Sequence, residues 1–181
     1  ALCRSRGQAE RAMARFQHLL GGLGLELHPA KSRIVDLREG REGFDFLGCH
    51  FRARMSGPMW ERGIRRYYLH RWPSQRSMKQ VRAKIRYLTR RSRIHADIRD
   101  VISDLNPVLR GWGNYYRTGN AAEKFNQLDW YVVARLQRLM TKRYGRNLHA
   151  GQWEAWTRPF FEAHGLYRLR GTVRYPTPRR A

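Results

Sequence analysis

Three stretches in the second half of the chain carry apolar residues at helical spacing, and they constrain the fold more than any other feature. Residues three and four apart share one face of an α-helix, so each stretch predicts an amphipathic helix. The short connections between them predict a three-helix bundle over residues 73–145. The apolar positions are Met78, Val81, Ile85 and Leu88; Ile98, Val101, Ile102 and Leu105; and Phe125, Leu128, Val132, Leu136, Leu139 and Met140.

Two signals predict where these helices begin and break. Pro107 lacks a backbone donor, so the pair Asn106–Pro107 is expected to kink or restart the second helix, with asparagine as its cap. Asn120 and Glu123 have the spacing of a capping box ahead of the third helix.

The first part of the chain predicts a smaller, mixed structure. A helical stripe ends at Gly21–Gly22, a short strand is expected over residues 33–37, and a returning strand over 44–52 completes a β-hairpin. Gly48 inside that strand predicts a bulge or a close approach by another backbone.

The predicted fold class is α+β. A helix and a β-hairpin occupy residues 1–72, a mainly α-helical three-helix bundle occupies 73–145, and a basic, aromatic extension occupies 146–181. Pro176 and Pro178 predict a loose tail at its end.

The charge balance indicates a polyanionic partner. Lys and Arg number 37 against 14 Asp and Glu, which gives a formal net charge of +23. Charge of that size destabilises a compact chain by self-repulsion and attracts nucleic acid. Most of these cations are arginine, whose planar guanidinium pairs with phosphate at two points and stacks on bases. Because 41% of the residues are hydrophobic and interleaved with the cations, the chain is expected to fold.

Several classes of protein are excluded. No window approaches the roughly 18 apolar residues that a membrane span needs. Cys3 and Cys49 are too few for a disulfide framework, so a reducing compartment, the cytoplasm, is expected. Neither the cysteines nor the histidines have the spacing of a zinc site, and no metal or other cofactor is expected in this chain. The glycines at 21–24 lack the following lysine of a phosphate-binding loop.

Residues 105–117 read L-N-P-V-L-R-G-W-G-N-Y-Y-R. Arg110, Asn114, Tyr115 and Arg117 lie off the apolar stripe of this segment, a mixture of cations, an amide and a ring that suits RNA. Trp112 lies on the stripe and is expected in the core, so Tyr115 is the better stacking candidate. The whole segment resembles the signature of the maturase-specific domain (domain X) of group II intron reverse transcriptases.

Two earlier motifs resemble the same enzymes. Residues 23–33, L-G-L-E-L-H-P-A-K-S-R, are similar to the late palm segment, and residues 44–48, F-D-F-L-G, are similar to the primer-grip element. The resemblance implies that residues 1–72 are the C-terminal part of the palm and 73–145 the thumb. It implies a primer grip at Phe46, Leu47 and Gly48. It makes Lys31 a candidate catalytic residue of the intact enzyme, as a proton donor to pyrophosphate or a contact of the nucleotide.

The catalytic motif of these polymerases is absent from the sequence. In the family a Tyr-Ala-Asp-Asp motif immediately precedes a segment like residues 1–5, and its carboxylates hold Mg²⁺. The chain has no adjacent acidic pair. We therefore expect the C-terminal part of a reverse transcriptase, with Mg²⁺ implied only for the intact polymerase, and leave open whether the chain takes part in enzymatic chemistry.

The function that the resemblance implies is assistance of group II intron splicing by binding the intron RNA, together with a grip on the template–primer duplex. A DNA target is a further partner that it suggests, and no membrane is involved. The candidate RNA-binding residues are Arg82, Arg86, Arg90, Arg110, Asn114, Tyr115, Arg117, Lys142 and Arg143. Two alternatives remain: a non-specific cationic RNA-binding or RNA-chaperone protein, and a membrane-surface protein that uses basic amphipathic helices.

The missing carboxylates generate a direct prediction. The purified chain should extend no primer on any template, with Mg²⁺ or with Mn²⁺, because two-metal polymerisation needs clustered carboxylates. A gel assay with a labelled primer measures this, and incorporation that persists through rigorous purification would contradict it.

Overall fold

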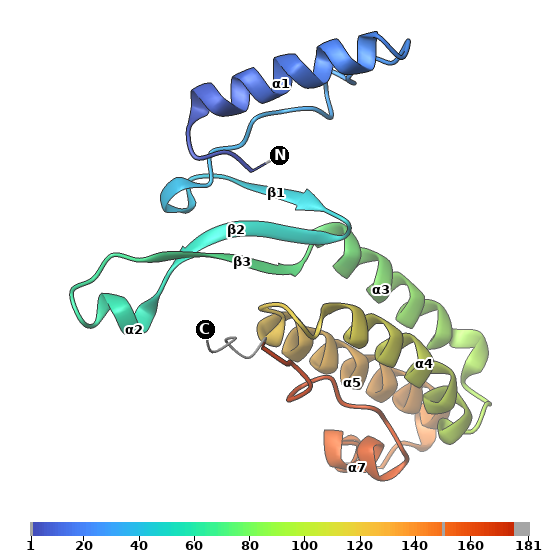
Figure 1. Cartoon of the computed structure of the whole chain (residues 1–181). Helices are drawn as coiled ribbons and strands as arrows, with labels where there is room; N and C mark the ends of the chain where they lie inside the picture. Colours follow the sequence, from blue (N-terminus) through green and yellow to red (C-terminus); the bar gives the residue numbers. More distant parts are fainter. Residues whose placement is uncertain (1, 150, 176–181) are drawn as a thin grey trace. The chain divides into compact units, whose positions relative to one another are not determined.

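A computed structural model of the chain describes residues 2–149 and 151–175, which divide into two compact units (Figure 1). The first unit comprises the chain up to residue 44 together with 52–69. The second comprises 45–51 together with the chain from residue 70 onward. The predicted α+β class is confirmed, and the division lies within the sheet rather than at residue 72.

Helix α1 (Arg6–Gly21) opens the first unit, followed by the short elements η1 (Arg38–Gly40) and α2 (Gly57–Trp60). Ser5 caps α1 by accepting a hydrogen bond from the Gln8 N–H, and the helix ends at the predicted glycines. None of the side chains of α1 is buried within the described residues.

The sheet contains three antiparallel strands in the order β1 (Gly43–Phe46), β2 (Cys49–Met55) and β3 (Tyr67–Pro73). The predicted strand over 33–37 is wrong. Asp36 accepts hydrogen bonds from the backbone and the guanidinium of Arg38, and this local polar turn replaces an extended strand. The same bonds hold the pKa of the Asp36 carboxyl well below its usual range.

The predicted single strand over 44–52 is also wrong, because it contains the hairpin turn. Leu47 and Gly48 have φ angles of +47° and +75°, as a two-residue type I′ turn requires. Gly48 is therefore a turn residue and not a bulge. The strand β3, which the sequence analysis did not predict, completes the sheet.

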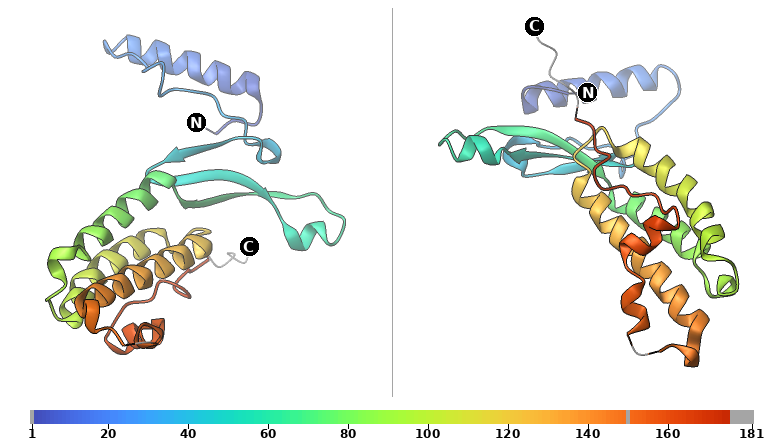
Figure 2. Two further views of the ribbon diagram at one scale, coloured as in Figure 1. Left: turned by 180° about the vertical axis from the view of Figure 1, so that it is seen from behind. Right: turned by 90° about the horizontal axis from the view of Figure 1, so that it is seen from below.

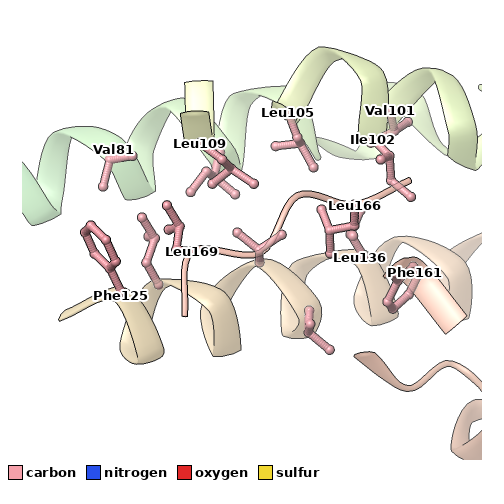
Figure 3. Close-up of a cluster of buried hydrophobic side chains, with 14 of the residues drawn as sticks. Val81, Val101, Ile102, Leu105, Leu109, Phe125, Leu136, Phe161, Leu166 and Leu169 are labelled. Atoms are coloured by element: carbon pink, nitrogen blue, oxygen red, sulfur yellow. The ribbon is translucent and has the colours of Figure 1, made fainter. Parts of the chain in front are cut away.

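The second unit contains the predicted three-helix bundle of α3 (Gln75–Leu88), α4 (Ile98–Tyr116) and α5 (Ala122–Tyr144) (Figure 2). Ser74 caps α3 through the Ser77 N–H, and Asp97 caps α4 through the Arg99 N–H. A 3₁₀ turn, η2 (Arg91–Arg93), links these two helices. Helix α3 packs against both α4 and α5, and nearly all the predicted apolar positions are buried (Figure 3).

The restart of the helix predicted at Asn106–Pro107 does not occur. Helix α4 runs through Pro107 because the positions on either side of it, Leu105 and Leu109, are fully buried in the core. Asn106 does not cap a helix. Its amide instead donates to the Gly165 carbonyl and accepts from the Tyr167 N–H, at 2.9 and 2.8 Å.

The capping box predicted for α5 is absent too. The residue before this helix is Ala121, and no side chain caps it. The Asn120 side chain accepts from the Arg71 N–H of β3 at 3.3 Å, and the Asn120 N–H donates to the Arg71 carbonyl at 2.7 Å. Glu123 accepts from Gln127. Asn120 therefore joins the sheet to the bundle.

The extension after residue 145 is part of the bundle as far as residue 175. It contains η3 (Gly145–Asn147), α6 (Gln152–Ala155) and α7 (Arg158–Ala163), followed by an extended segment. Trp156, Phe161, Leu166 and Leu169 are buried, and the last two lie between α4 and α5 (Figure 3). The tail predicted at Pro176 and Pro178 lies outside the described residues.

One buried carboxylate fixes this segment. Asp129 of α5 is 3% exposed, and its two oxygens accept from the Leu169 and Arg170 N–H groups at 3.1 and 2.9 Å. The Arg158 guanidinium lies 3.5 Å from the same side chain and balances its charge. Two backbone donors and one cation thus compensate for removing the carboxylate from water.

Asp129→Asn should destabilise the fold for two reasons. The NH₂ group of the new amide would face a backbone N–H, and Arg158 would lose its negatively charged partner. We expect a loss of about 1–3 kcal/mol in the free energy of unfolding, measured by urea titration. Glu154→Gln, an exposed change of the same kind, is the control and should leave stability unchanged. Equal unfolding midpoints for Asp129→Asn and the parent protein would refute a fixing role.

Candidate nucleic-acid interface

Two sequence motifs meet at the hairpin turn. The Tyr115 hydroxyl donates to the Leu47 carbonyl at 2.8 Å, and the Tyr116 hydroxyl lies 3.1 Å from the Gly48 carbonyl. A Cβ atom on Gly48 would lie only 2.7 Å from the Tyr116 hydroxyl oxygen. Glycine is therefore required here both by its φ angle and by the tyrosine.

The Tyr116 hydroxyl belongs to a chain of hydrogen bonds that we call the Tyr116 relay. Its oxygen lies 2.7 Å from the Ser77 hydroxyl, which in turn lies 3.1 Å from the Trp112 indole nitrogen. The indole only donates and the Gly48 carbonyl only accepts. The arrangement that satisfies every group therefore runs from Trp112 to Ser77, from Ser77 to Tyr116, and from Tyr116 to Gly48.

The relay leaves the tip of the hairpin exposed and fixed. Phe46 and Leu47 are 58% and 71% exposed, although the turn that carries them is held by two tyrosines. Trp112 packs against Tyr116 and Phe125, with ring centroids 4.8 and 5.6 Å apart, which confirms its expected core position. The three predicted primer-grip residues thus lie together at the hairpin tip, where Phe46 ends β1 and Leu47 and Gly48 form the turn.

Tyr116→Phe should lower stability by about 1–2 kcal/mol, because it removes the donor to Gly48 and leaves the Ser77 hydroxyl without its acceptor. Burial raises the pKa of the Tyr116 phenol above its ordinary value of 10.0. The protonated Tyr116 hydroxyl therefore makes its full contribution to the free energy of unfolding below about pH 10. This contribution is lost as the pH rises through the pKa of Tyr116 in the folded protein. The stability difference between parent and variant should narrow above about pH 10, in urea titrations at stepped pH.

The comparison variant is Tyr115→Phe. Tyr115 is 56% exposed, so this variant should lose less free energy of unfolding than Tyr116→Phe. A Tyr116→Phe protein as stable as the parent at pH 7 would refute the relay.

The four residues predicted on α4 do not share one surface. The Arg110 guanidinium carbon is 5.2 Å from the Tyr167 ring centroid of the C-terminal segment, and the backbone carbonyl of Arg117 accepts from the Arg174 N–H. Tyr115 lies about 140° round the helix from Arg110, beside the hairpin. Asn114 is exposed. The four candidates therefore do not form one contact surface, and their binding of RNA stays a prediction.

The candidate arginines Arg82, Arg86 and Arg90 do not all lie on α3. The helix ends at Leu88, so Arg90 lies beyond it and does not continue the i, i+4 spacing of Arg82 and Arg86. The Thr89 hydroxyl, which donates to the Ile85 carbonyl, occupies the helix end. Arg82 is half-buried with its guanidinium carbon 5.5 Å from the Tyr131 ring centroid, whereas Arg86 is exposed.

The predicted pair on α5 has two different roles. Lys142 is exposed. Arg143 is half-buried, and its guanidinium donates to the carbonyls of Ile94, at 2.6 Å, and Ala96. Arg143 thus fastens the connection between α3 and α4 to α5, and its donors are used inside the protein.

Helices α3 and α5 together present one cationic surface, which we call the α3–α5 face. Arg82 stacks on Tyr131, and the Arg135 guanidinium donates to the hydroxyl and carbonyl of Thr89. These contacts fix which sides of the two helices adjoin. At 100° of rotation per residue, the other members on α3 lie within about 60° of Arg82 around the helix axis, and those on α5 lie within about 40° of Tyr131. The face consists of Lys79, Arg82 and Arg86 of α3 and Lys124, Tyr131, Arg135, Arg138 and Lys142 of α5.

Lys79, Lys124, Arg135 and Arg138 are not among the candidates predicted from the sequence. A signal for this face was present, however. No Asp or Glu occurs between Glu61 and Asp97, or between Asp129 and Glu154, although cations recur in both stretches. Within these gaps no acidic residue can neutralise a neighbour at i+3 or i+4.

The candidate catalytic residue lies in the first unit. Lys31 is exposed in a turn, where its N–H donates to the His28 carbonyl at 3.1 Å. Among residues 2–149 and 151–175, no three His, Cys, Asp or Glu side chains gather as metal ligands. The described residues therefore do not fit the magnesium site that a polymerase needs, and we derive no step through a metal.

Comparison with known protein families gives a match to the helical part of the chain. Residues 78–158 match the family model of the group II intron maturase-specific domain, which confirms the resemblance found at residues 105–117. The match includes most of the bundle and the beginning of the extension, whereas the motifs at 23–33 and 44–48 lie outside it. No curated protein sequence matches the chain. No helix in the described part of the chain is long and apolar enough to cross a membrane.

Proposed function

Residues 78–158 form a group II intron maturase-specific domain, and from this premise we propose that the chain assists group II intron splicing by binding the intron RNA through the α3–α5 face. The family assigns the role in splicing. The observation that supports this surface as the RNA contact is that seven cations gather on it and none of its members is acidic.

The chemistry of the face suits an RNA backbone. Guanidinium and ammonium groups neutralise phosphates and release the counterions condensed on them, which supplies most of the affinity. Double-stranded RNA is contacted mainly through backbone and 2′-hydroxyl groups across a wide, shallow minor groove, so a broad helical surface fits it better than an inserted loop.

Part of the face is preorganised. Arg82 rests on Tyr131, and Arg135 is held by two hydrogen bonds to Thr89 at 2.9 and 2.8 Å. Cations that are already ordered lose less side-chain entropy when RNA binds. They also shape the surface on which the freer side chains Lys79, Arg86 and Lys142 make phosphate contacts.

Acidic residues of the second unit lie mostly away from this face. Asp97 caps α4, and Asp100 and Asp104 occur in its first half, where Asp104 pairs with Arg93. Asp129 is buried against the C-terminal segment. Glu123, 3.9 Å from Lys124, lies beside the face. None of the members of the face itself is acidic.

A second contact is suggested by the hairpin tip. Phe46 and Leu47 are exposed on a turn held by Tyr115 and Tyr116, and a rigid apolar tip can lie against the sugars and base edges of a duplex. We propose that this tip grips the template–primer duplex in a reverse transcriptase that contains the chain, with a DNA target as a further partner.

The triple variant Lys79→Ala, Arg86→Ala, Lys142→Ala tests the RNA contact. These side chains are exposed, so the melting temperature should not change. RNA affinity should fall, and the slope of log affinity against log salt should flatten by roughly two to three units, since each lost phosphate contact removes just under one. Fluorescence anisotropy with group II intron RNA over a salt series measures both.

The matched control removes three exposed arginines elsewhere in the same unit, Arg99, Arg168 and Arg174, and should have a smaller effect. If both triple variants lose affinity equally, and unrelated RNA competes as well as intron RNA, the chain is a non-specific cationic RNA-binding protein. Co-sedimentation with anionic liposomes examines the membrane-surface alternative.

A further inference from the structure

Tyr87, near the end of α3, is a large aromatic ring left in water. It is 55% exposed, and no hydrogen bond to its hydroxyl occurs within residues 2–149 and 151–175. Around the axis of α3, Tyr87 lies about 100° from Arg86, so it is outside the α3–α5 face. Core packing does not explain a tyrosine here.

Two cations accompany this ring. The Arg90 guanidinium carbon lies 4.2 Å from its centroid and the Lys84 Nζ lies 5.9 Å from it. The first distance is that of a stacked pair, shorter than the contacts of Arg82 with Tyr131, at 5.5 Å, or of Arg110 with Tyr167, at 5.2 Å. Tyr87 and Arg90 thus form a two-membered stack with Lys84 beside it.

The stack lies at the end of α3. Thr89 closes the helix through its hydroxyl, and Arg90 then has φ −74° and ψ 162°, an extended conformation. From this position, three residues after Tyr87, the Arg90 guanidinium lies over the ring.

We propose that the Tyr87–Arg90 stack binds an unpaired nucleobase of the RNA, with Lys84 and the neighbouring Arg91 contacting its phosphates. This inference rests on the proposed function. It adds the recognition of an unpaired base, whereas the α3–α5 face is proposed to contact only the RNA backbone. Aromatic rings and guanidinium planes both stack on unstacked bases, which is how proteins usually recognise loops and bulges. The surroundings favour nucleic acid over a protein partner, since no carboxylate occurs from residue 62 to 96.

The test compares two RNAs of equal length with the full chain, a fully paired duplex and the same duplex with one bulged 2-aminopurine. Tyr87→Ala should weaken binding of the bulged RNA by about tenfold and leave the duplex affinity unchanged. Tyr87→Phe, which keeps the ring, should bind as the parent does. The 2-aminopurine fluorescence should be quenched on binding the parent and Tyr87→Phe, but not on binding Tyr87→Ala.

Tyr68→Ala is the matched control, because Tyr68 is 43% exposed with the Arg66 guanidinium 5.6 Å from its ring centroid, in the first unit. It should not change discrimination between the two RNAs. Equal loss on both RNAs with Tyr87→Ala, or no loss on either, would overturn the base-stacking site while the α3–α5 face stands. If the Lys79, Arg86 and Lys142 variant binds RNA as well as the parent, the proposed function fails instead. A parent protein that binds neither RNA would overturn both.

Discussion

The hydrogen bonds of Tyr116 are the constraint on which the second unit depends. One phenol joins the end of α4 to the hairpin turn and, through Ser77, to the first turn of α3. The Gly48 carbonyl also accepts from the Ser74 N–H at 2.8 Å, so the turn and the beginning of α3 are held together directly. Because Ser77 and Tyr116 are both buried, these bonds are shielded from water, and losing one of them lowers the free energy of unfolding. Trp112, Ser77, Tyr116 and Gly48 therefore act as one unit, and replacing any of them disturbs the other three.

A formal charge of +23 opposes folding, and the structure shows how the chain tolerates it. Some arginines serve as internal donors: Arg143 binds two backbone carbonyls, and Arg135 binds Thr89. Arg158 balances the buried Asp129. Others place the guanidinium plane against an aromatic ring, so that one side of the group contacts apolar surface while its N–H edge can stay in water. Other cations stay exposed, and those on the adjoining sides of α3 and α5 form the α3–α5 face, where a polyanion would relieve their repulsion.

The sequence predicted the helices well because apolar residues at helical spacing report directly on burial. It failed where a tertiary partner replaced a local one. Asn106 and Asn120 have the composition of caps, yet their side chains bind Tyr167 and Arg71, distant in sequence. The turn at Leu47–Gly48 was missed because a non-glycine residue occupies its first left-handed position. Among the site residues, Arg82, Arg86 and Lys142 lie on one face. Arg143 does not, since residue type alone cannot tell an arginine that binds carbonyls inside from one that faces solvent.

Helix α3 connects the two surfaces to which we assign nucleic-acid contacts. Ser74 and Ser77 on its first turns hold the hairpin turn, whereas Lys79, Arg82 and Arg86 belong to the α3–α5 face. Met78, Val81 and Ile85 on its inner side are buried in the bundle, so the helix cannot rotate without opening the core. The tip and the face lie within the same compact unit, so a ligand that contacts both would bind at two places on that unit. Two linked contacts bind more tightly than either contact alone.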